Sequence, residues 1–245
     1  MLVNQLIREA DIVLEVLDAR MVQETRNKEI EDKIARSGKK LIYVVTKCDL
    51  AGKEHLEKVK KELTPSIFVS ATKHYGTSML LQKIMQISKG EDATVAVVGY
   101  PNVGKSSVIN ALKGRQSASV SSTPGHTKGI QKIKINKKIY LIDSPGVLAY
   151  QENDVIALVL TGSKDPARLK DPELAAMRLL TLFLEQDKKA KIEEAYQITL
   201  QENEAEPLLE EIAMKKHRLK KGNIPDTETT ARILLHDWQK GKLLW

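Results

Sequence analysis

The sequence lacks the features that mark secreted, membrane-spanning and disulfide-linked proteins. It contains one cysteine, Cys48, among 245 residues, which excludes an internal disulfide. A single cysteine also favours a reducing compartment, and we predict that the protein is located in the cytoplasm. No apolar run approaches the roughly 18 residues of a membrane-spanning helix. Arg8, Glu9 and Asp11 interrupt the apolar core that a secretory signal would need. We therefore expect no membrane partner.

The sequence also has fewer acidic than basic residues. Lys and Arg number 39 against 32 Asp and Glu, for a formal net charge of +7. Such an excess favours an anionic partner, and nucleotide phosphates alone would account for only a little of it. With 42% apolar and 29% charged residues, the chain is typical of globular proteins and long enough for one large domain or two modest ones.

Over the first 150 residues, short apolar runs alternate with charged helical stretches. This alternation predicts βαβ units and a mostly parallel sheet. The expected strands cover 12–17, 41–45, 67–69, 95–98 and 139–142, with helices near 27–37, 53–62, 77–88 and 105–112. Residues 133–138 resemble a hairpin that adds an antiparallel strand. We predict an α/β domain over residues 1–150.

The pattern changes after Pro145, where strand signals become sparse and a small all-helical domain is predicted over residues 151–245. Asp171-Pro-Glu173 favours a helix start, because aspartate caps helices and proline suits the first helical position. The apolar face expected on this helix consists of Leu174, Met177, Leu180, Phe183 and Leu184. Two further helices are expected over 205–221 and from about Asp226 to Lys240, the latter stopped by Gly241.

Gly99-Tyr-Pro-Asn-Val-Gly-Lys-Ser106 matches the phosphate-loop pattern G-x-x-x-x-G-K-[ST], between a predicted strand and a predicted helix. Backbone N–H groups of such a loop wrap phosphates at a helix N-terminus. Lys105 is expected to reach the outer phosphates and to act in catalysis, and the Ser106 hydroxyl to bind magnesium. The residues expected to hold the phosphates are Asn102, Val103, Gly104, Lys105, Ser106 and Ser107. The alternative is a glycine-rich turn without a ligand.

Thr46-Lys-Cys-Asp49 fits the guanine motif [N/T]-K-x-D, and Ser70-Ala-Thr72 resembles the S-A-[KT] element that contacts the guanine oxygen through Ser70 and Ala71. Asp49 can accept two hydrogen bonds from guanine, whereas adenine lacks that donor pair, so GTP is favoured over ATP. Lys47 is expected to lie along the base and brace the phosphate loop. Each short motif has a simpler alternative, a capped strand end or a strand-to-loop turn.

Asp143-Ser-Pro-Gly146 follows a predicted strand and fits D-x-x-G. Asp143 is expected to hold magnesium through water, and the Gly146 N–H to sense the γ-phosphate. Thr127 is the threonine expected to complete the magnesium shell, with Thr123 as second choice. His126 is interpreted as a solvent-facing loop histidine in preference to a catalytic base.

The motifs occur in an unusual order. In an ordinary Ras-like protein the guanine motif follows D-x-x-G, but here it precedes the phosphate loop, and none follows Gly146. Gly162-Ser-Lys-Asp165 fails the pattern because its lysine and aspartate are adjacent. Circular permutation explains the order, since surface loops can be cut and rejoined without changing the sheet. The alternative is a P-loop ATPase with a fortuitous T-K-C-D.

In this order of motifs the chain resembles the circularly permuted GTPases of the YlqF/RbgA type, which assist large ribosomal subunit assembly. Val16-Leu-Asp-Ala-Arg20 with Arg26-Asn27 is similar to that family's D-A-R-x-P-x-x-x-R-N stretch, although Met21-Val22 lacks the proline. Thr46 replaces the commoner asparagine, and the tail 230–243 is similar to the family's last helix, ending in G-K-L. The resemblance implies a P-loop NTPase, Ras-like mixed sheet in permuted order, GTP/GDP and Mg²⁺ as ligands, and the large ribosomal subunit precursor and its rRNA as partners. We expect a monomer.

Val147 and Leu148 stand where small GTPases carry a water-orienting glutamine, which predicts slow intrinsic hydrolysis raised by the ribosomal particle. Asn102 either offers an oxygen to a potassium ion beside the phosphates or only turns the loop; both readings stay open. Incidental hydrolysis in a GTP-dependent RNA-binding module is the alternative function.

A basic cluster, Lys215-Lys-His-Arg-Leu-Lys-Lys221, lies in the second predicted helix. Its opposite, packed face is expected to consist of Leu208, Leu209, Ile212 and Leu219. The cluster is interpreted either as a solvated charged surface or as a contact with RNA phosphates. The family resemblance favours ribosomal RNA.

Overall fold

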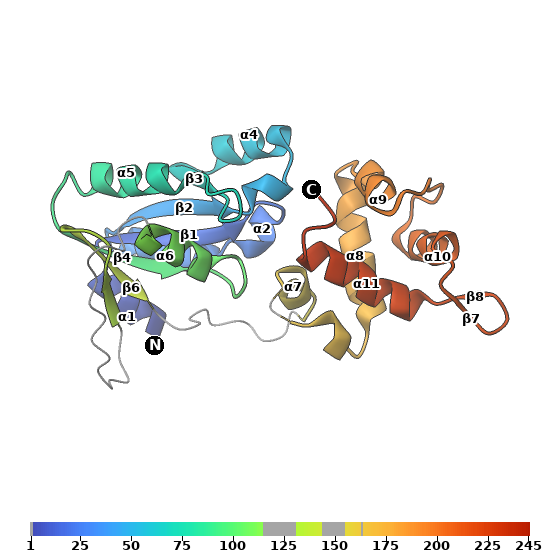
Figure 1. Ribbon diagram of the computed structural model, residues 1–245. Helices are drawn as coiled ribbons and strands as arrows, with labels where there is room; N and C mark the ends of the chain where they lie inside the picture. The colour runs from blue at the N-terminus through green and yellow to red at the C-terminus, as the bar shows by residue number, and fades with distance from the viewer. Residues whose placement is uncertain (1, 115–130, 144–154, 163) are drawn as a thin grey trace. The chain divides into compact units, whose positions relative to one another are not determined.

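The computed structural model describes residues 2–114, 131–143, 155–162 and 164–245 (Figure 1). The chain divides into two compact units, Met1–Ala149 and Tyr150–Trp245. Among the described residues, no helix combines the length and apolar character needed to cross a bilayer.

The first unit is built on a six-stranded sheet in the order β3-β2-β1-β4-β6-β5. Its strands are β1 (Ile12–Asp18), β2 (Lys40–Thr46), β3 (Ser66–Val69), β4 (Ala93–Val98), β5 (Gln131–Lys134) and β6 (Ile139–Asp143). All neighbouring pairs are parallel except β5 and β6, which form an antiparallel hairpin. The predicted mixed, mostly parallel sheet is confirmed.

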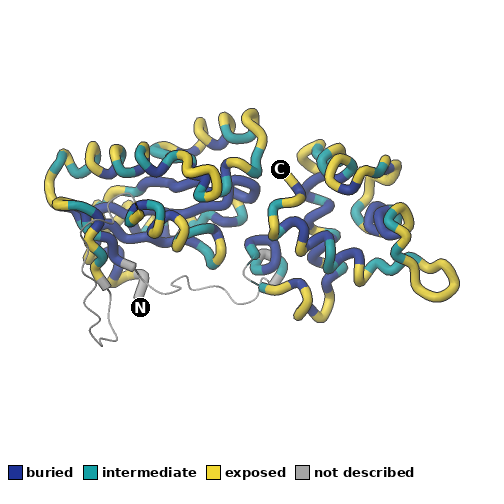
Figure 2. Tube along the Cα trace, viewed as in Figure 1, coloured by how far each residue is buried: buried dark blue, intermediate teal, exposed yellow. Residues whose placement is uncertain are grey.

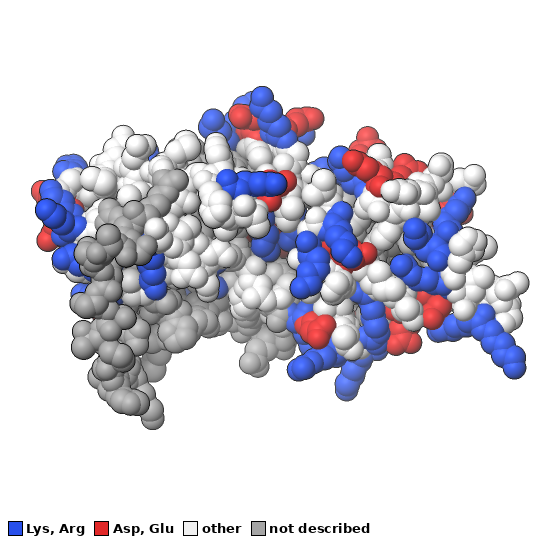
Figure 3. Space-filling model, viewed as in Figure 1, with Lys and Arg blue, Asp and Glu red and all other residues white. Residues whose placement is uncertain are grey.

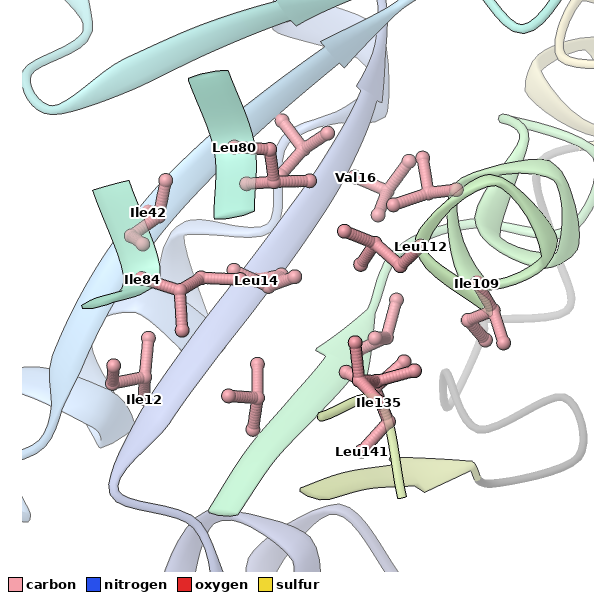
Figure 4. Close-up of a cluster of buried hydrophobic side chains, with 14 of the residues drawn as sticks. Ile12, Leu14, Val16, Ile42, Leu80, Ile84, Ile109, Leu112, Ile135 and Leu141 are labelled. Carbon is pink, nitrogen blue, oxygen red and sulfur yellow. The ribbon is translucent and has the colours of Figure 1, made fainter. Parts of the chain in front are cut away.

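Helices cover both faces of this sheet. They are α1 (Leu2–Glu9), α2 (Val22–Thr25), α3 (Lys28–Arg36), α4 (Lys53–Glu62), α5 (Thr77–Ile87) and α6 (Lys105–Gly114), with a 3-10 turn η1 (Cys48–Leu50). On one face, side chains of α5 and α6 pack on alternate residues of β1, such as Leu14 (Figure 4). On the other face α1 and α3 pack against Val13, and α4 packs against Leu17. Every residue of β1 is buried, as a central parallel strand requires (Figure 2).

The second unit is mainly helical. Its elements are α7 (Val155–Leu160), η2 (Pro166–Arg168), α8 (Pro172–Glu185), α9 (Lys189–Tyr196), α10 (Ala205–Lys215), β7 (Leu219–Lys220), β8 (Ile224–Pro225) and α11 (Thr227–Gln239). The Asp171 carboxylate accepts the Leu174 N–H at 3.0 Å, so it caps α8 as predicted. The Asp226 carboxylate accepts the Thr229 N–H at 3.1 Å and caps α11 in the same way.

Three aromatic rings form the centre of this second unit. Phe183 packs edge-to-face on Trp238 and Trp245, with centroid separations of 5.8 and 5.1 Å. The buried indole N–H of Trp238 donates to the Leu160 carbonyl at 2.8 Å. The unit therefore has a core of its own.

Two predictions for the helical unit were wrong in detail. The helix expected over 205–221 ends at Lys215, because His217 has a positive φ of 53° and the chain turns into the β7–β8 pair, which leaves Leu219 41% exposed. In α8, Leu174 is 50% exposed instead of packed. The buried side of α8 includes the small residues Ala175 and Ala176, which a search for large apolar side chains passes over.

Candidate nucleotide-binding site

The sequence motifs converge at one edge of the sheet. β1 ends at Asp18, β2 at Thr46 and β6 at Asp143, and these strands run parallel with β4, which leads into the phosphate loop. Because the carboxyl ends of parallel strands share an edge, the segments that follow them are neighbours. β1 and β4 are neighbours in the sheet. After β1 the chain continues to β2 on one side of this pair, and after β4 it continues to β5 and β6 on the other side. Such a switch point is where open α/β sheets bind ligands.

The phosphate loop begins at a position that only glycine can occupy. Gly99 has a φ of +142°, and a Cβ there would lie 2.5 Å from the Val16 carbonyl oxygen. The Lys105 ammonium donates to the carbonyls of Gly99 and Tyr100 at 2.6 and 2.5 Å, which holds its charge over the loop. Ser106 is exposed in the first turn of α6, where the helix N-terminus favours anions.

Thr46 joins the guanine motif to the phosphate loop. Its buried hydroxyl lies 2.9 Å from the Leu17 carbonyl oxygen and is also hydrogen-bonded to the carbonyl of Val103, 57 residues further along the chain. A Cβ on Gly104 would meet the Thr46 hydroxyl at 3.4 Å, so the Thr46 side chain packs beside the Gly104 backbone. The structure thus brings the early motif and the later loop together.

The two base motifs also meet. The exposed Asp49 carboxylate accepts a hydrogen bond from the Thr72 hydroxyl at 3.1 Å. The Ser70 hydroxyl lies 3.1 Å from that of Thr72 and accepts the Lys73 N–H at 3.1 Å. Asp49 therefore lies beside the S-A-T turn with its carboxylate open to a base.

Lys47 makes a contact that sequence reasoning missed. It adopts the left-handed backbone region, with φ 54°, and its ammonium donates to Asp18 at 2.7 Å. Arg20 donates to the same carboxylate through Nε and a terminal nitrogen, at 3.0 and 2.9 Å. Burial alone would raise the pKa of the Asp18 carboxyl, but the Arg20 and Lys47 charges outweigh it and lower the pKa to about 2. The D-A-R stretch was recognisable in the sequence, but the sequence did not show that its aspartate binds Lys47.

The magnesium ligands are only partly described. Ser106 supplies an exposed hydroxyl beside the loop, and β6 ends at Asp143 next to β4, which fits the preference of Mg²⁺ for oxygen ligands and substrate phosphates. Asn102 is exposed within the loop, with a φ of 58°. The following predicted positions lie outside the described residues or have no described side chain: Thr123, His126, Thr127, the Asp143 carboxylate, Gly146, Val147 and Leu148.

Strand order, loop and converging motifs define a P-loop nucleotide-binding protein of the GTPase class. Two family comparisons agree: the 50S ribosome-binding GTPase family matches residues 94–218, and the RsgA GTPase family matches residues 9–153. The chain belongs to the circularly permuted GTPases of the YlqF/RbgA type. The predictions of family and fold class are confirmed.

Individual relatives cover nearly the whole chain. It is 41% identical to the uncharacterized GTP-binding protein MJ1464 of Methanocaldococcus jannaschii over 99% of this chain and 65% of that protein. It is 34% identical to nuclear/nucleolar GTPase 2 of Arabidopsis thaliana over 98% of this chain and 42% of that protein. The GDP-bound structure of YlqF from T. maritima matches with 25% identity and a TM-score of 0.66, covering 100% of this chain and 96% of that one. The chain thus spans less than two thirds of the length of these two sequence relatives.

Proposed function

We propose that this chain binds GTP and GDP and hydrolyses GTP as an assembly factor for the large ribosomal subunit. The observation that carries the proposal is the buried hydrogen bond between Thr46 and the Val103 carbonyl. It joins the motif that reads guanine to the loop that holds phosphates, so that one nucleotide can occupy both.

Each part of the nucleotide has a candidate partner. Asp49 accepts the guanine N–H groups, with Lys47, Ser70 and Ala71 around the base. Lys105 and the backbone N–H groups of residues 102–107 bind the phosphates. The Ser106 hydroxyl would bind Mg²⁺ directly and Asp143 would hold it through water, while Thr127 would complete the magnesium shell when GTP is bound. The Gly146 N–H would sense the γ-phosphate.

Hydrolysis by the chain alone is proposed to be slow. Val147 and Leu148 follow D-x-x-G and have no polar group with which to orient water. A group supplied by the ribosomal particle, or a K⁺ ion held near Asn102, would then raise the rate.

The helical unit is the proposed contact with rRNA. We define the basic arm as residues 215–225, the end of α10 and the β7–β8 pair. Basic side chains project from this end of the helical unit (Figure 3). Lys215, Lys220 and Lys221 are exposed. Within the described part of the chain, Lys220 is the one of these three that forms an ion pair, with Asp226 at 3.6 Å. Phosphate contacts by such residues would be salt-sensitive and weakly sequence-specific. The names of relatives, a 50S ribosome-binding family and a nucleolar GTPase, support this partner.

The proposed active form is a monomer in a reducing compartment, taken as the cytoplasm. The base motifs and the phosphate loop all come from a single chain, and the lone Cys48 is a buried free thiol.

The test is the GTPase rate with and without purified large ribosomal subunits, in potassium and in sodium buffer. We expect slow turnover alone and a rise of at least about tenfold with subunits. Co-sedimentation with large-subunit particles should require a non-hydrolysable GTP analogue. Absence of analogue-dependent association would overturn the ribosomal part of the proposal and leave nucleotide binding intact.

The second candidate is a GTP-dependent RNA-binding module whose hydrolysis is incidental. The apolar Val147 and Leu148 favour it. Turnover that stays negligible with ribosomal particles and potassium, together with GTP-dependent RNA binding, would select this function.

A further inference from the structure

Asp18 is a buried carboxylate that binds the partly exposed Lys47 of the guanine motif. Its residue is 1% exposed, and its two oxygens accept the Arg20 backbone N–H at 3.0 Å, two guanidinium nitrogens of Arg20, and the Lys47 ammonium at 2.7 Å. Arg20 is itself 2% exposed and balances the buried charge. Because Arg20 already balances the buried charge of Asp18, the hydrogen bond to Lys47 is not needed to compensate for burial.

The loop after β1 fixes Asp18 in place. The Asp18 N–H donates to the Thr25 hydroxyl at 3.1 Å, and that hydroxyl donates to the Met21 carbonyl at 2.6 Å. A ring nitrogen of His55, on α4, lies 2.8 Å from the Ala19 carbonyl oxygen. The Lys47 side chain, by contrast, is 27% exposed. The Asp18 side chain is thus fixed by the surrounding loop, and it can restrain the more exposed Lys47 side chain.

We propose that Asp18 is a positioning residue for guanine nucleotide, acting through Lys47; this inference rests on the proposed nucleotide-binding function. A lysine has four rotatable side-chain bonds, and ordering them during binding weakens affinity. Asp18 orders the aliphatic part of the Lys47 side chain before the nucleotide binds. Lys47 lies two residues before Asp49 in the sequence. The base then enters a site whose lysine is already placed, and the D-A-R stretch provides the anchor.

A double-mutant cycle tests the coupling in the full chain, with GDP affinity measured by calorimetry. Asp18→Asn and Lys47→Met should each raise the Kd by about tenfold. The double variant should bind within about twofold of Lys47→Met alone, because an untethered lysine is the only route by which Asp18 acts. Fully additive effects, or an unchanged Kd for Asp18→Asn, would overturn the proposal.

Asp18→Asn leaves the buried Arg20 without its charge partner and can impair folding. Asp18→Asn combined with Arg20→Gln removes both buried charges and still frees Lys47, so it should show the same tenfold loss. Val13→Ala is a matched core control on the same strand. A purely structural role lowers the fraction of molecules that bind and the melting temperature, as Val13→Ala should, but leaves the Kd of the binding fraction unchanged. If the wild type itself fails to bind GDP, the proposed function falls, which is distinct from failure of the cycle.

Discussion

The two units carry their candidate functions in different ways. In the first unit the site depends on single, buried side chains at strand ends: Asp18 is 1% exposed and Thr46 4%. In the helical unit the candidate RNA surface consists of exposed lysines on the basic arm, of which Lys220 alone has an acidic partner among the described ion pairs. A geometric site depends on each residue, whereas a charged surface depends on their number. Single substitutions should therefore have large effects in the first unit and small ones in the second.

The largest effect is expected from Lys105→Ala. It removes the charge that the loop presents to the outer phosphates, and GDP affinity should fall by at least about 100-fold in calorimetry. RNA retention on filters without nucleotide should be unchanged, because the basic arm is intact. Near-normal GDP binding would mean that the loop is not a phosphate site.

Asp49→Asn should change the base that is recognised. The amide can no longer accept both guanine N–H groups, so GDP affinity should fall by about 100-fold. Xanthosine diphosphate, whose base presents an acceptor at that position, should gain affinity. Equal losses for both nucleotides would show that Asp49 does not face the base.

Glu15, on β1, should make the stability of the first unit depend on pH. Its carboxylate accepts the Asn27 N–H at 2.8 Å, and burial, with the Glu31 charge, raises its pKa from 4.5 to about 8. The folded state then binds one more proton than the unfolded chain between these values, so the free energy of unfolding falls as pH rises through that range. A loss of about 2 kcal/mol is expected between pH 5.5 and 7.5.

Denaturant titrations followed by circular dichroism would measure that loss, and Glu15→Gln should abolish most of it. Both tryptophans, Trp238 and Trp245, lie in the helical unit, so their fluorescence provides an internal control. A wild-type pH dependence retained in Glu15→Gln would assign the effect to other groups.

Thr46→Val should weaken GDP binding by about tenfold. The substitution leaves the buried carbonyls of Leu17 and Val103 without the hydroxyl, a cost of about 1–3 kcal/mol shared between stability and loop placement. Thr46→Asn restores a donor and should bind GDP nearly as well as the wild type. Equal affinity in Thr46→Val would separate the guanine motif from the phosphate loop energetically.

The smallest effect is expected in the helical unit. Lys220→Gln with Lys221→Gln should weaken RNA binding only several-fold and reduce the salt slope by about 1.4, at roughly 0.7 per phosphate contact of single-stranded RNA. Lys60→Gln with Lys61→Gln, an exposed pair on α4, is the matched control and should change neither. Identical losses in both pairs would point to a general charge effect without a docking surface.

The same contrast explains what the sequence could predict. The strands of the first unit were located to within about two residues because burial on both faces produces continuous apolar runs. The phosphate loop and guanine motifs were located because their chemistry fixes residue types at set spacings. The Asp18–Lys47 contact was not, since it joins residues 29 apart through the β1–β2 register, which pairs Asp18 with Thr46.

In the helical unit the start of α8 could be predicted from its aspartate cap, and the last helix was expected from about Asp226, next to the start of α11. α7 and α9 were missed, and the end of α10 was misplaced because Lys215–Lys221 carries no glycine or proline to mark the turn. Residues with ordinary helix propensity can adopt a positive φ when tertiary packing favours the turn, as His217 does.

Calorimetry of the wild type with GDP and with ADP, in the presence of Mg²⁺, tests most directly whether the early motif and the later loop form one pocket. The account predicts saturable GDP binding at one site per chain and an ADP affinity at least about 100-fold weaker. Comparable affinities for the two nucleotides, or no binding of either, would contradict it.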